Sequence, residues 1–281
     1  MSNSNQLPIR LNFSSCPNDT FMFDAMIHHK IDTEGLTFDV GIADVEALNH
    51  EAMEEDIAVT KLSYHAYAHV AERYKILSSG SALGRGNGPL LVCKHHIDDM
   101  SQVTVAIPGK YTTAAVLLRL AFPKITKTEL YLFSDIEPAV MHEEVAAGVL
   151  IHEGRFTYAH KGLQLIADLG KCYEERTSQS IPLGCIAVSR TLEKKMQETI
   201  NRVLRRSIEF ALANPRESLD FISEYAQEMD YKVMQQHIAL YVNNFSVDLG
   251  TEGRKSVETF FAEVVKEGVI DSMPRDIFLD E

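Results

Sequence analysis

Residues 149–158 read Val-Leu-Ile-His-Glu-Gly-Arg-Phe-Thr-Tyr. Three successive aliphatic side chains predict a short buried strand, and Gly154 predicts a turn soon after it. His152 then lies at the carboxyl end of a strand, where α/β sheets bind their ligands. An imidazole has an ordinary pKa of about 6.5, so it can exchange a proton near neutral pH. A structural histidine that hydrogen-bonds its neighbours would also suit this position, and the stretch alone leaves both interpretations open.

The length and composition are those of a globular protein. The chain has 281 residues, of which 45% are hydrophobic and 24% are charged, enough for two lobes or one large domain. Acidic residues number 40 against 27 basic ones, which gives a net charge of −13. This balance argues against a nucleic-acid partner, because phosphate binding requires a basic face. A small anionic ligand, held by a local lysine or a helix start, is compatible with it.

The cysteines and the apolar segments predict a cytoplasmic protein without a membrane partner. Cys16, Cys93, Cys172 and Cys185 form no Cys-x-x-Cys pair, so we interpret them as reduced thiols and expect no cysteine zinc site. The first residues, MSNSNQLPIRLNF, lack the basic segment and apolar core of a secretory signal. No apolar run approaches the roughly 18 residues that span a bilayer.

Two stretches share the order strand, polar loop and helix start. One covers residues 9–20 and the other residues 103–113. Two such units can place two helix starts opposite each other across a cleft, where free backbone N–H groups bind anions or carbonyl oxygens. The hydroxyls of Thr112 and Thr113 would then contact a ligand. The alternative is that these residues only cap the helix, which contributes about 1 kcal/mol.

A third candidate position follows the predicted strand 57–60. Lys61, Leu62 and Ser63 come directly after this strand, and a helix is predicted from Tyr64 onward. A lysine at a strand end can meet the carboxylate of a ligand, whereas most lysines of globular proteins are simply solvated. The pattern does not decide between these two interpretations.

Two further patterns resemble known site motifs but lack their context. His65 and His69 lie four residues apart on a predicted helix, a spacing that can chelate zinc. The glutamate that makes His-Glu-x-x-His specific is absent, so a solvated helix face is the better interpretation. The glycine-rich loop 80–89 joins strand to strand rather than strand to helix, which fails the dinucleotide fingerprint. We interpret it as a turn or a connection between lobes.

The remaining pattern defines the fold class. Strands and helices alternate as far as Val188, which predicts an α/β fold with a mostly parallel or mixed sheet. The character then changes, because residues 193–213 form a long amphipathic pattern and further helices are predicted near 216–228, 231–242 and 257–265. This helical tail must cover one of the lobes.

Taken together, the motifs resemble one family. They read Ser-Cys-Pro-Asn-Asp-Thr-Phe at 15–21, Thr-Lys-Leu-Ser-Tyr at 60–64, Ala-Leu-Gly-Arg-Gly-Asn-Gly-Pro at 82–89, Pro-Gly-Lys-Tyr-Thr-Thr-Ala at 108–114 and Ile-His-Glu-Gly-Arg-Phe-Thr-Tyr at 151–158, with Asn-Asn-Phe-Ser at 243–246. As an ordered set they are similar to 1,4-dihydroxy-6-naphthoate synthase, an enzyme of the futalosine route to menaquinone. No single motif is specific enough alone.

The resemblance implies a two-lobed fold of the type II periplasmic-binding-protein kind, with the ligand between the lobes. Lobe 1 would comprise residues 1–93 and 188–281, and lobe 2 residues 94–187. It also implies the reaction, a carbon–carbon lyase step that cleaves cyclic dehypoxanthinyl futalosine to 1,4-dihydroxy-6-naphthoate and dihydroxyacetone. Neither a cofactor nor a metal is implied.

The family's functional residues carry over to matching positions. Its catalytic base matches His152, and its substrate contacts match Lys61, Leu62, Ser63, Thr112 and Thr113. The only partner implied is the small-molecule substrate, and the oligomeric state stays open.

Two other functions share this fold. One is a solute-binding protein without chemistry, against which the missing export signal argues. The other is the sister enzyme chorismate dehydratase, and the stretch around His152 favours the synthase over it.

Overall fold

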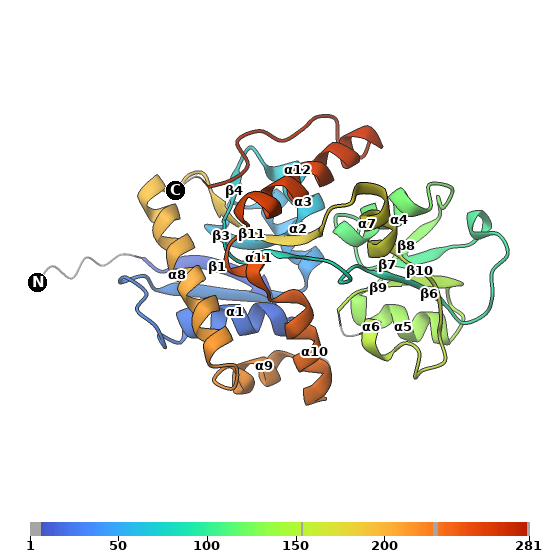
Figure 1. Ribbon diagram of the computed structural model, residues 1–281, viewed down its shortest axis with the longest axis horizontal. Coiled ribbons are helices and arrows are strands. Elements are labelled where there is room, and N and C mark those ends of the chain that lie inside the picture. Colours follow the sequence, from blue (N-terminus) through green and yellow to red (C-terminus); the bar gives the residue numbers. More distant parts are fainter. Residues whose placement is uncertain (1–6, 153, 227–229, 280–281) are drawn as a thin grey trace, which may run out of the picture.

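The structure is a computed structural model that describes residues 7–152, 154–226 and 230–279. Two β-sheets lie beside each other, each with its own helices (Figure 1). The first has the strand order β2-β1-β3-β11-β4, with β5 paired to β11, and the second the order β10-β6-β9-β7-β8. The predicted two-lobed α/β class is therefore confirmed.

The strands of the first sheet are β1 (Ile9–Ser14), β2 (Phe38–Ala43), β3 (Val59–Ser63), β4 (Tyr74–Ile76), β5 (Ala82–Gly84) and β11 (Ile181–Ser189). Those of the second sheet are β6 (Leu90–Cys93), β7 (Val105–Ile107), β8 (Thr128–Leu130), β9 (Ala147–Leu150) and β10 (Gln164–Asp168).

The helices of the first lobe are α1 (Pro17–Ile27), α2 (Val45–Glu54), α3 (Tyr64–Val70), α8 (Lys194–Ala213), α9 (Leu219–Tyr225), α10 (Tyr231–Tyr241), α11 (Asn244–Val247) and α12 (Gly250–Lys266). Those of the second lobe are α4 (Thr113–Ala121), α5 (Phe133–Met141), α6 (Gly154–Thr157) and α7 (Leu169–Thr177), with a 3-10 turn at Met100–Gln102.

Strand direction decides which loops meet. In the first sheet β1 is parallel to β3, so the loop after Ser14 and the residues after Ser63 leave the same edge. In the second sheet β7 is parallel to β9, so the loop that precedes Thr112 and the turn that contains His152 also leave a common edge. These are the carboxyl edges of the parallel strands, where α/β folds bind ligands.

The predicted amphipathic helix is α8, and it packs its apolar face against α1 and the first sheet. Val203, Leu204 and Ile208 are fully or almost fully buried in a cluster that also contains Phe13 and Met22. Burying an aliphatic side chain of this size stabilises a fold by about 1.5–3 kcal/mol. None of the described helices is long and apolar enough to cross a membrane.

The connections between the lobes lie earlier than the predicted boundaries at 94 and 188. Strand β6 pairs with β9 and β10 in the second sheet, although it precedes residue 94. Strand β11 begins at Ile181 and pairs with β3 in the first sheet. The chain therefore crosses between β5 and β6 and returns between α7 and β11. Loop 85–89 is the first of these connections, one of the two interpretations that the glycine-rich pattern leaves open.

Candidate active site

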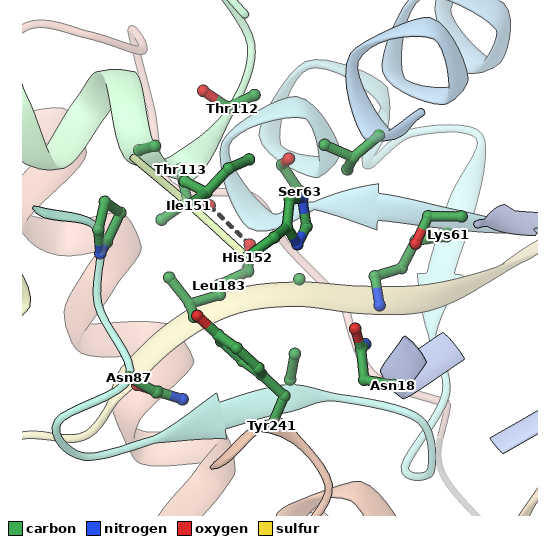
Figure 2. Close-up of a pocket in the computed structure, with 16 residues that line it drawn as sticks. Asn18, Lys61, Ser63, Asn87, Thr112, Thr113, Ile151, His152, Leu183 and Tyr241 are labelled. Atoms are coloured by element: carbon green, nitrogen blue, oxygen red, sulfur yellow. Dashed lines mark hydrogen bonds between the residues drawn. The ribbon is translucent and has the colours of Figure 1, made fainter. Parts of the chain in front are cut away.

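A cavity is lined by residues of both lobes (Figure 2). Its walls are built from the ends of β1 and β3, the start of α1, loop 85–89, the start of α4, the turn after β9 and strand β11. Lys61, Ser63, Thr112, Thr113 and His152 all line it. The structure thus brings five of the six predicted site residues to one cavity.

Leu62 is the predicted site residue whose side chain does not line this cavity. Successive side chains of a strand point to opposite faces, so Leu62 faces away from Lys61 and Ser63. Its side chain is fully buried in a hydrophobic cluster to which both lobes contribute. Contact between Leu62 and a ligand would have to involve its backbone.

Lys61 forms a buried ion pair with Asp19. Its Nζ donates to Asp19 Oδ1 at 2.5 Å, and Lys61 is only 5% exposed, so the interpretation as a solvated lysine is wrong. Asp19 also accepts hydrogen bonds from the backbone N and the Oγ of Ser14 and from Nδ2 of Asn18. A buried charge needs partners that offset its loss of water, and four donors do this for the Asp19 carboxylate.

His152 lies two residues beyond the end of β9, in a backbone conformation with φ of +54°. This left-handed region is uncommon for residues other than glycine and is enriched at functional sites. The His152 ring contacts the edge of Phe133, with ring centroids 4.8 Å apart. Cys16 Sγ lies 3.4 Å from its Nδ1 and 3.6 Å from its Nε2. Glu153 falls outside the described residues.

The surroundings of His152 keep its imidazole neutral. The side chain retains some surface toward the cavity, but protein atoms enclose the ring, and this burial lowers the pKa to about 4. The charge of Asp19 raises the pKa in part, and that of Lys61 lowers it. At neutral pH the ring is therefore deprotonated and has a free nitrogen lone pair, as a general base requires.

His237, on α10, is a site residue that the sequence did not predict. It is fully buried, and its Nε2 hydrogen-bonds Asn18 Oδ1 at 2.9 Å. Burial, with smaller contributions from His152, Lys61 and Arg155, holds its pKa well below the ordinary value. The one local signal is its spacing of four residues from Tyr241, which places both on one helix face.

The two threonines already have protein partners. Thr112 caps α4, because its Oγ1 accepts from Ala115 N and donates to Gly109 O, so the capping interpretation is confirmed for this residue. Thr113 Oγ1 donates to the carbonyl oxygen of Leu183 on β11, the contact dashed in Figure 2. Thr113 thereby joins the second lobe to the first.

Other contacts also join the lobes around the cavity. The backbone N of Tyr111 donates to Glu46 Oε1 at 3.0 Å, and Cys16 touches His152 as described above. A Cβ on Gly109 would lie 2.4 Å from Glu46 Cδ, so a side chain there would have to displace the Glu46 carboxyl group that accepts from Tyr111. The two lobes are thus in contact across the cavity.

The His65–His69 pair lies at a second cavity, with Lys110, Tyr111 and Arg119. The two Nε2 atoms are 3.4 Å apart, and burial lowers the pKa of both rings. His65 is buried, so the interpretation of a solvated face is wrong for it. Within the described part of the chain, no group of three or more His, Cys, Asp or Glu residues is placed to hold a metal ion.

Comparison with known proteins adds independent evidence. A family model described as menaquinone biosynthesis matches residues 9–266. A 1,4-dihydroxy-6-naphthoate synthase of Thermus thermophilus is 42% identical, with 96% of this chain and 99% of that protein covered. A synthase of the same name from Streptomyces coelicolor is 36% identical, over 95% of this chain and 96% of the other.

Solved structures agree with the fold. Protein AF1704 of Archaeoglobus fulgidus superposes with a TM-score of 0.88 at 36% identity, covering 96% of this chain and all (100%) of that one. The periplasmic aliphatic sulphonate binding protein of Escherichia coli gives a TM-score of 0.65 at 8% identity, over 96% of this chain and 90% of the other. The second likeness shows the periplasmic-binding-protein fold alone. The match to the family model and the identity along nearly the whole chain show that this protein belongs to the menaquinone-biosynthesis family that includes these 1,4-dihydroxy-6-naphthoate synthases.

Proposed function

We propose that this protein is a carbon–carbon lyase that cleaves cyclic dehypoxanthinyl futalosine to 1,4-dihydroxy-6-naphthoate and dihydroxyacetone in menaquinone biosynthesis. The observation that carries the proposal is the neutral imidazole of His152 in a cavity lined by both lobes. The names of the relatives, which match over nearly the whole chain, support the same reaction.

His152 is proposed to act as the general base. It takes a proton from the substrate as the carbon–carbon bond breaks, and the electrons released complete the aromatic ring of the naphthoate. Formation of that ring drives the step. A positioned base of this kind contributes about 100- to 10,000-fold to the rate.

The other predicted residues are proposed to hold the substrate. Lys61 Nζ uses one N–H on Asp19 and has two more to offer, so it can bind a substrate oxygen while the ion pair persists. Ser63, at the start of α3, and Thr112 and Thr113, at the start of α4, lie where backbone N–H groups bind oxygen atoms. Leu62 would contribute through its backbone.

We further propose that the protein works in the cytoplasm on this small molecule. Cys93, Cys172 and Cys185 are free thiols in the part of the chain that the structure describes. Unpaired cysteines are typical of a reducing compartment.

The decisive experiment is incubation of the purified protein with cyclic dehypoxanthinyl futalosine, with detection of the naphthoate by mass and fluorescence. Product formation at an enzymatic rate is expected. Tight binding without product would instead indicate a solute-binding protein. Turnover of chorismate in a parallel reaction would indicate the sister dehydratase.

A further inference from the structure

Asn87 is a fully buried residue in the wall of the cavity, and its side chain has no hydrogen-bond partner. It lies in the connection between β5 and β6 and is 0% exposed. Neither Nδ2 nor Oδ1 of its amide is bonded within the described structure. The neighbouring polar side chains of the cavity differ, since Ser14, Asn18 and Lys61 all bond to Asp19.

Two unpaired polar atoms at a buried position are costly. A buried donor or acceptor without a partner loses its hydrogen bond to water and gains none from the protein. Natural folds rarely keep such groups without a reason, and a ligand-binding role is one of the few that explain them. Figure 2 shows the Asn87 amide reaching from its loop toward Tyr241, on the side of the cavity opposite Thr112.

The loop around Asn87 is held in place by contacts on both sides of it. Arg85 donates to the carbonyl oxygen of Ser178, and the backbone N of Gly86 donates to Glu174 Oε1. The guanidinium of Arg155 donates to the carbonyl oxygen of Gly88. The backbone on either side of Asn87 is therefore fixed before any ligand arrives, which lowers the entropy cost of binding.

We propose that Asn87 binds the substrate directly, with its amide contacting a substrate hydroxyl. A hydroxyl satisfies both atoms at once, because it accepts from Nδ2 and donates to Oδ1. A carboxylate would satisfy Nδ2 but face the lone pairs of Oδ1. The inference rests on the proposed function and adds a residue to its substrate contacts.

The test is Asn87→Leu, which keeps the approximate shape and removes both polar atoms. Because the amide is unpaired in the free protein, the melting temperature of Asn87→Leu should equal or exceed that of the wild type. Loss of two hydrogen bonds to the substrate should lower kcat/KM by about 10- to 100-fold, chiefly through a higher KM.

Asn201→Leu is the matched control. Asn201 is also buried, but it lies outside the cavity, and its amide bonds to Ser78 Oγ and Ser79 N. This variant should lose stability and keep the kcat/KM of its folded fraction. Gly84→Ala should displace the same amide without removing it, since a Cβ there would lie 2.9 Å from Asn87 Nδ2. It should raise KM in the same direction as Asn87→Leu.

The outcomes separate the inference from the function on which it rests. If the wild-type protein makes naphthoate and Asn87→Leu keeps kcat/KM within about twofold, Asn87 does not bind the substrate, although the function stands. A lowered melting temperature, with kcat/KM reduced only as far as the folded fraction, would also reject the inference. No turnover by the wild type would reject the proposed function itself.

Discussion

The rings of His152 and His237 lie nearly parallel, with centroids 5.9 Å apart and planes 18° from each other. His152 follows β9 in the second lobe and His237 belongs to α10 in the first, so this stack joins the lobes at the cavity. Through Asn18, His237 is also linked to Asp19 and hence to Lys61. His152, the proposed base, is therefore packed against a hydrogen-bond network that includes Lys61.

His237→Phe should separate the stacking from the hydrogen bond. The ring is kept, but Asn18 Oδ1 loses its partner in a buried position, which should reduce the free energy of unfolding by about 1–3 kcal/mol. Urea unfolding measures this loss. His237→Gln, which retains a donor, should recover part of it. Equal stability of wild type and His237→Phe would show that the bond to Asn18 contributes nothing.

The pH dependence of kcat/KM should reflect the burial of His152. Its pKa is lowered to about 4, and the neutral form is the active one. Activity should therefore persist below pH 6.5 and fall only as the pH drops through the range near that lowered value. The folded fraction must be followed at each pH. His152 and His237 are held neutral in the fold and take up protons when unfolded, so acid also destabilises the protein. An acidic limb centred near 6.5 in fully folded protein would contradict the burial.

Lys61→Met should be destabilising and inactive, and a second change should distinguish the two effects. Removing one partner of a buried ion pair costs about 3–5 kcal/mol, because Asp19 keeps its charge without the opposite charge of Lys61. Adding Asp19→Asn removes that charge and should restore much of the stability. Activity should stay low, since the double variant lacks the Lys61 Nζ that binds the substrate. If the double variant regains turnover along with stability, Lys61 serves only to neutralise Asp19.

Thr112 and Thr113 should respond differently to loss of the hydroxyl. Thr112→Val removes a helix cap and should lower the free energy of unfolding by about 1 kcal/mol. Thr113→Val removes the bond to Leu183 across the lobes and should mainly raise KM. Serine at either position keeps the hydroxyl and is the control. Should valine and serine variants behave alike in both stability and KM, the hydroxyls have neither role.

Local sequence is sufficient to predict the site residues that lie at the ends of strands. Short apolar runs followed by polar residues predict the loops after β1, β7 and β9 and the carboxyl end of β3, although residues 61–63 lie within that strand rather than after it. Parallel strand direction then brings their ends together, and Lys61, Ser63, Thr112, Thr113 and His152 meet at one cavity for that reason.

The remaining features depend on tertiary structure. The orientation of Leu62 follows from the face of β3 that meets the core, and the crossings at β6 and β11 follow from which sheet each strand joins. His237 reaches the site only because α10 packs against α1, and Asn87 is notable only because its amide is left unpaired. The spacing of His237 from Tyr241 places both on one helix face, but it does not show that this face meets α1.

The central claim is that His152 is the base of the proposed cleavage, and comparison of wild type with His152→Asn tests it most directly. Both proteins are incubated with cyclic dehypoxanthinyl futalosine under saturating conditions, and naphthoate is followed by fluorescence. His96→Asn serves as the matched control, because the side chain of His96 is 83% exposed. We expect His152→Asn to lower turnover by about 100- to 10,000-fold while substrate affinity changes far less, and the control to match the wild type. Turnover by His152→Asn above about a tenth of the wild-type rate would contradict the account, since removing a general base costs more than that.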